Sequence, residues 1–151
     1  MKFAFAALFF LGGVAVADDK ANEKLLKDIG GSYTVVAVEK GGEQAPAEFM
    51  KSFESITIKG NKLVISFKEN GKIEEKIAVL IVDASKKPVH VDLKPQDSPK
   101  KNDETFLGIV ETAEDTIKFC WGEGPNAKRP TDFTSTKDNK NFLLTFKRSS
   151  K

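Results

Sequence analysis

The chain of 151 residues contains a single cysteine, Cys120, and a single histidine, His90. One cysteine allows no disulfide within the chain, so the fold has to be stabilised by its apolar core. One histidine and one cysteine are also too few for the three or four ligands of a zinc site. The net charge is only +2, which gives no electrostatic basis for nucleic-acid binding. The sequence therefore predicts no metal, no other cofactor and no nucleic-acid partner.

Catalytic motifs are equally scarce. No G-x-S-x-G turn is present, and Gly122-Glu123-Gly124 is followed by Pro125, which is typical of a turn and not of a phosphate-binding loop. His90 and Asp92 share one face of a predicted strand and are the only candidates for a general base with its orienting carboxylate. The alternative is that both lie on the solvent-facing wall, which we favour. An enzyme, such as a small hydrolase or isomerase, is the least favoured class.

Residues 1–17 have the pattern of a secretory signal peptide. Met1-Lys2 is followed by an uncharged, apolar run from residue 3 to 17 that ends in Ala15-Val16-Ala17. The run of 15 residues is short for a membrane-spanning helix, which needs about 20. We therefore expect cleavage near Ala17 and a secreted or periplasmic domain over residues 18–151, without a membrane span and monomeric.

Apolar periodicity predicts a short helix followed by a chain of strands. Leu25, Leu26 and Ile29 share one face of a helix over residues 19–29, and Pro46 opens a second helical turn over 46–53. From residue 33 onward the period is two, and Asn70-Gly71 is a strong hairpin signal. The predicted strands are 33–39, 55–59, 63–67, 73–82, 89–93, 106–111, 116–121, 131–134 and 142–147.

Consecutive hairpins make sequential strands antiparallel neighbours, and a sheet of this length tends to close on itself. The sequence thus predicts an all-β fold: a single up-and-down barrel of about eight strands with a short N-terminal helix. Eight of the ten aromatic residues after residue 17 fall on the predicted inward phase. They are Tyr33, Phe67, Phe106, Phe119, Trp121, Phe133, Phe142 and Phe146.

These rings allow two interpretations. They line a cavity that binds a small apolar ligand, or they fill an eight-stranded barrel, which is just wide enough to be packed by its own side chains. In the second case the protein is a solid-core envelope or protein-interaction domain. Cys120 is expected to be an inert residue beneath a loop or the helix.

Five sequence blocks occur in the order seen in a family of lipocalin-like domains of unknown function described from planctomycete bacteria. They are Gly31-Ser32-Tyr33, Asp83-Ala84-Ser85-Lys86-Lys87-Pro88 with Val91-Asp92-Leu93, Leu107-Gly108-Ile109, Ile117-Lys118-Phe119-Cys120 and Arg129-Pro130-Thr131-Asp132-Phe133. The chain resembles this family over residues 31–148. It departs from the family at Tyr33, where tryptophan is usual, and at Val110, where an aromatic residue is common. The resemblance implies an exported bacterial barrel and supplies no catalytic residue. Lipocalins stack an arginine on the aromatic residue of the first strand, so the resemblance also implies that Arg129, with Arg148 as the alternative, stacks on Tyr33.

Overall fold

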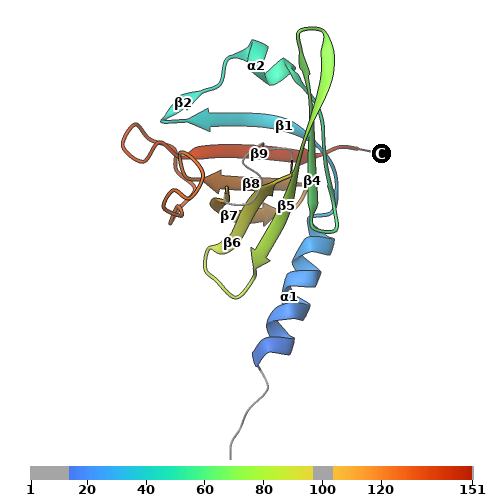
Figure 1. Cartoon of the computed structure of the whole chain (residues 1–151), viewed down its shortest axis with the longest axis vertical. Coiled ribbons are helices and arrows are strands. Elements are labelled where there is room, and N and C mark those ends of the chain that lie inside the picture. Colours follow the sequence, from blue (N-terminus) through green and yellow to red (C-terminus); the bar gives the residue numbers. More distant parts are fainter. Residues whose placement is uncertain (1–13, 97–103, 151) are drawn as a thin grey trace, which may run out of the picture.

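The structure, a computed structural model, describes residues 14–96 and 104–150. This part of the chain forms mostly β-strands, with an N-terminal helix and one short helix between strands (Figure 1). The helices are α1 (Val14–Asp28) and α2 (Ala47–Lys51). The strands are β1 (Gly31–Lys40), β2 (Glu43–Gln44), β3 (Phe53–Lys59), β4 (Lys62–Glu69), β5 (Lys72–Asp83), β6 (Val89–Pro95), β7 (Phe106–Ala113), β8 (Thr116–Trp121) and β9 (Phe142–Arg148).

The predicted barrel is confirmed. Strands β3 to β9 pair in sequence order, each antiparallel to the next, and β1 pairs with both β3 and β9. The second of these pairings closes the sheet into an eight-stranded antiparallel barrel, to which the two-residue β2 adds a short extension. The hairpin between β4 and β5 turns at Asn70 and Gly71, with φ of 52° and 77°. Glycine adopts such positive values without steric cost, and asparagine tolerates them better than most residues.

Strand β1 does not pair evenly with its two neighbours. It contacts β9 from Tyr33 to Lys40, but it contacts β3 only from Gly31 to Tyr33. Beyond Tyr33 the two strands are no longer paired, and α2, which lies between β2 and β3 in the chain, contacts both β1 and β3. The barrel is therefore tightly closed at the end near α1 and wider at the end near α2.

The closed end holds the most deeply buried side chains. Tyr33, Phe119 and Phe146 are each at most 1% exposed, and their rings contact one another in a chain with centroid separations of 6.5 and 5.5 Å. Ile29, just after α1, is fully buried against them. The Tyr33 hydroxyl donates a hydrogen bond of 2.7 Å to the Ile29 carbonyl, which fixes the end of α1 to the barrel.

Arg148, and not Arg129, stacks on Tyr33. The Arg148 guanidinium lies 5.0 Å from the ring centroid and donates hydrogen bonds to the carbonyl oxygens of Gly30 (2.7 Å) and Asp28 (2.9 Å). The prediction for Arg129 is wrong because the β1–β9 register places Arg148 directly opposite Tyr33. Burial raises the pKa of Tyr33 although Arg148 opposes this, so the phenol stays a hydrogen-bond donor.

One predicted strand and one predicted helix boundary also differ from the structure. The last but one predicted strand, 131–134, is wrong: these residues belong to the loop from Gly122 to Asn141 that connects β8 to β9. Asp132 accepts hydrogen bonds from the Thr134 backbone N–H (3.1 Å) and from its hydroxyl, which holds a local turn in place of a strand. The first helix begins at Val14 and ends at Asp28, so it is longer at its N-terminus than predicted. Residues 1–13, most of the predicted signal peptide, lie outside the described residues.

Candidate ligand-binding site

A cavity of about 690 Å³ occupies the wide end of the barrel. It lies at the end of each strand that is remote from α1, where Phe106 begins β7, Trp121 ends β8 and Phe142 begins β9. The volume falls in the range of roughly 300 to 1,000 Å³ that is typical of small-molecule sites. The barrel is therefore packed solid at one end and hollow at the other.

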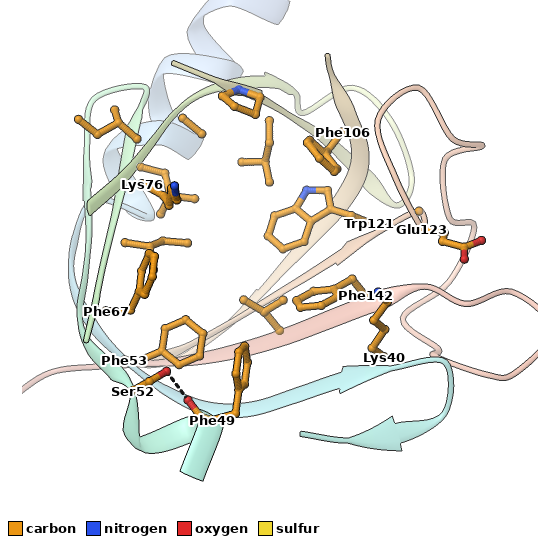
Figure 2. Close-up of a pocket in the computed structure, with 18 residues that line it drawn as sticks. Lys40, Phe49, Ser52, Phe53, Phe67, Lys76, Phe106, Trp121, Glu123 and Phe142 are labelled. Atoms are coloured by element: carbon orange, nitrogen blue, oxygen red, sulfur yellow. Dashed lines mark hydrogen bonds between the residues drawn. The ribbon is translucent and has the colours of Figure 1, made fainter. Parts of the chain in front are cut away.

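Six aromatic side chains line the cavity, and Figure 2 shows them arranged around one central space. They come from five strands and from α2. They are Phe49, Phe53, Phe67, Phe106, Trp121 and Phe142. Aliphatic residues complete the wall: Leu63, Ile65, Ile77, Ala78, Leu93, Pro95 and Leu144. The lining is thus almost wholly apolar, which suits a ligand whose body is hydrophobic.

Trp121 is fixed in the wall by its neighbours. Its ring stacks on Phe119 with a centroid distance of 5.2 Å and an interplanar angle of 6°. Its partner in the β7–β8 register is Gly108, whose missing side chain leaves room for the indole. The indole Nε1 is buried and has no hydrogen-bond partner among the described residues. Trp121 is the only tryptophan of the chain, so its fluorescence reports on this cavity alone.

Phe49 and Phe53 form the side of the cavity that sequence reasoning missed. Their rings meet edge to face at 5.3 Å, and Phe49 is 46% exposed. The Ser52 hydroxyl between them donates a hydrogen bond of 2.6 Å to the Phe49 carbonyl (Figure 2). A β-bulge at Glu54 shifts the alternation of β3, which returns Phe53 to the inner face. This part of the wall also bridges the space between β1 and β3.

The eight aromatic residues predicted to line the interior fall into three groups. Phe67, Phe106, Trp121 and Phe142 line the cavity. Tyr33, Phe119 and Phe146 are buried in the closed end and are not part of the cavity wall. Phe133 lies in the loop between β8 and β9, belongs neither to the core cluster nor to the cavity, and is half-buried.

Charged groups are confined to the rim of the cavity. Lys40 and Lys76 occupy inward-facing positions of β1 and β5, opposite Phe142 and Ile65 in the sheet register. Glu123 is the acidic residue of the lining, and its carboxylate pairs with Lys140 at 3.7 Å. Neither Lys40 nor Lys76 has an ion-pair partner among residues 14–96 and 104–150. Within these ranges, the rim therefore carries two positive charges that no ion pair neutralises.

Asp92, the predicted orienting partner of His90, is paired with Arg129. The Asp92 carboxylate is bound by both terminal nitrogens of the Arg129 guanidinium, which also donates to the Gly108 carbonyl. Partial burial and the positive charge of Arg129 lower the pKa of His90 below its ordinary value. Arg129 thus attaches the loop between β8 and β9 to the outer wall of the barrel. Its role is structural, but at a different place from the one predicted.

Cys120 lies beneath the same loop, with its Sγ 3.9 Å from the Thr134 carbonyl oxygen. The thiol is fully buried, and this burial raises its pKa to about 11. Thiolate is the reactive form, so we expect native Cys120 to react with iodoacetamide at pH 8 at least a hundredfold more slowly than the unfolded chain. Mass spectrometry of the alkylated protein with and without guanidinium measures this ratio. Equal rates would show an accessible thiol.

Comparison with protein-family models, with curated proteins and with solved structures finds no match to this chain. No group of three or more potential metal ligands occurs within the described ranges. None of the helices described is long and apolar enough to cross a membrane. The function has therefore to be argued from the cavity itself.

Proposed function

We propose that this protein is a non-catalytic binding module that holds a small apolar ligand in the wide end of its barrel. The observation that carries the proposal is the 690 Å³ cavity with its six aromatic residues. Apolar surface of this kind gains roughly 25 cal/mol for each Å² that a ligand removes from water. The cavity favours this function over that of a solid-core interaction domain, for which the same rings would act only as filler.

The signal-peptide pattern of residues 1–17 supports a secreted or periplasmic location for this module. The resemblance to lipocalin-like bacterial domains supports the same setting. The pairing of Asp92 with Arg129 supports a non-catalytic role, because it removes the carboxylate that would orient His90.

Decanol is a suitable first probe because it is apolar, uncharged and small enough for the cavity. We expect a saturable change in Trp121 emission on titration with decanol, and a matching heat of binding by calorimetry. Ala78→Phe should weaken binding at least fivefold, because Ala78 lines the cavity and a phenyl ring there occupies part of its volume.

Val79→Phe is the matched control. Val79 is the next residue of β5, lies outside the cavity lining and alternates to the outer face of the sheet. It should therefore leave decanol affinity within twofold of the unmodified protein. The proposal fails if decanol gives no saturable response, or if both variants bind it equally well.

A further inference from the structure

The rim of the cavity differs from its interior in charge. The interior is lined mainly by aromatic and aliphatic side chains, whereas Lys40 and Lys76 lie on two sides of the opening (Figure 2). Both residues are exposed, yet both belong to strand positions that face inward. A long lysine side chain can lay its methylene groups along the apolar wall while its ammonium group stays at the opening.

Among the described residues, no acidic side chain lies within ion-pair distance of Lys40 or Lys76, although Glu43 is the cross-strand partner of Lys40 in the β1–β2 register. Glu123 is paired with Lys140. Glu74 takes the next inward position of β5 beyond Lys76, toward the hairpin tip, and does not line the cavity. On the β1 side, Glu39 alternates to the outer face, where it accepts a hydrogen bond from Gln44. An apolar cavity with two rim lysines that form no ion pair within the described part of the chain is complementary to a molecule with an apolar body and one anionic end.

We infer that the ligand of this barrel is an anionic amphiphile, whose apolar part fills the cavity and whose negative head group lies between Lys40 and Lys76. This inference rests on the proposed function and specifies the class of ligand. Lysine acts as a compact point charge, unlike the planar fork of arginine that matches a carboxylate. The rim therefore selects for charge and not for head-group shape, so a carboxylate and a sulfate on the same chain bind alike.

The test compares probes that share a ten-carbon chain: decanoate, decyl sulfate, decanol and decyltrimethylammonium. Lys40→Gln and Lys76→Gln should each lower the affinity for decanoate and decyl sulfate about two- to fivefold. The two substitutions together should lower it about tenfold, as expected for solvent-exposed charge pairs. Raising the salt concentration from 50 to 500 mM should also lower the affinity for the two anionic probes, because salt screens their attraction to the lysines. Decanol affinity should stay within twofold in every variant, and the cationic probe should bind more tightly to the double variant.

Lys62→Gln is the matched control, because Lys62 is an exposed strand lysine that does not line the cavity. It should leave all four affinities unchanged. If the double variant and Lys62→Gln bind decanoate equally well, the inference is wrong while the proposed function stands. A loss for decanoate but not for decyl sulfate would contradict selection by charge alone. If no probe binds the unmodified protein, the proposed function fails as well.

Discussion

Phe119→Ala is expected to lower the free energy of unfolding by about 3 to 5 kcal/mol, the usual cost of removing a fully buried phenyl ring. Phe119 is 0% exposed and lies at the junction of the solid and hollow halves of the barrel. Its ring stacks on Trp121 and also packs against Phe146 at 5.5 Å. The variant loses both aromatic contacts and leaves a cavity that the strands on either side cannot fill.

Urea denaturation followed by circular dichroism measures this loss, provided that the slope of the transition is unchanged. Phe49→Ala is the control: Phe49 is 46% exposed and its one ring contact is with Phe53. We expect it to cost less than about 1.5 kcal/mol, because only half of the ring is removed from water in the folded protein. Similar losses for the two variants would contradict the division between a structural core and a ligand cavity.

The strand order and closure of this barrel could be predicted because its signals are local. The alternation of Ile56 and Ile58 marks a strand, and Asn70-Gly71 determines the turn between two of them. Every β-pairing except those of β1 with β3 and β9 joins strands consecutive in sequence. Once the hairpins are identified, closure follows from the number of strands and their shared apolar face.

The errors arise where a position depends on residues far away in sequence. Arg129 and Arg148 are equal candidates for Tyr33 until the register of β1 against β9 is known, and that pairing joins residues more than 100 positions apart. The sequence places Phe53 in a helical turn over residues 46–53, whereas Phe53 begins β3, and the bulge beside it has no clear sequence signal. A short alternating pattern predicts an inward-facing Phe133, but local turns override that pattern.

The cavity itself could not be predicted from composition. Aromatic residues on an inward face are equally consistent with a filled and a hollow barrel, because eight strands are close to the limit between the two. Two features make this barrel hollow at one end. The pairing of β1 with β3 stops at Tyr33, and the rings of Phe49 and Phe53 line the cavity. This geometry depends on where pairing stops, and not on which residues are apolar.

Gly108→Ala is expected to lower the free energy of unfolding by about 2 to 3 kcal/mol, although alanine is the better residue in most strands. A Cβ atom at Gly108 would lie 2.7 Å from the Nε1 of Trp121 and 2.8 Å from the Cys120 carbonyl oxygen. The indole is held by its stack on Phe119, and the carbonyl belongs to the adjacent strand β8. Neither can move aside without disturbing the sheet, so the methyl group has to be accommodated by strain.

Gly124→Ala is the control, since a Cβ there meets no atom within 4 Å, and we expect it to change stability by less than about 0.5 kcal/mol. Combining Gly108→Ala with Trp121→Leu separates the two contacts, because the smaller side chain removes only the clash with the indole. The loss in free energy of unfolding for the double variant should be smaller than the sum of the losses for the two single variants. We expect a difference of about 1 to 2 kcal/mol, a coupling typical of residues in direct contact. Strict additivity would show that Gly108 is required by the β8 backbone alone, and that the position of Trp121 in the cavity wall does not depend on it.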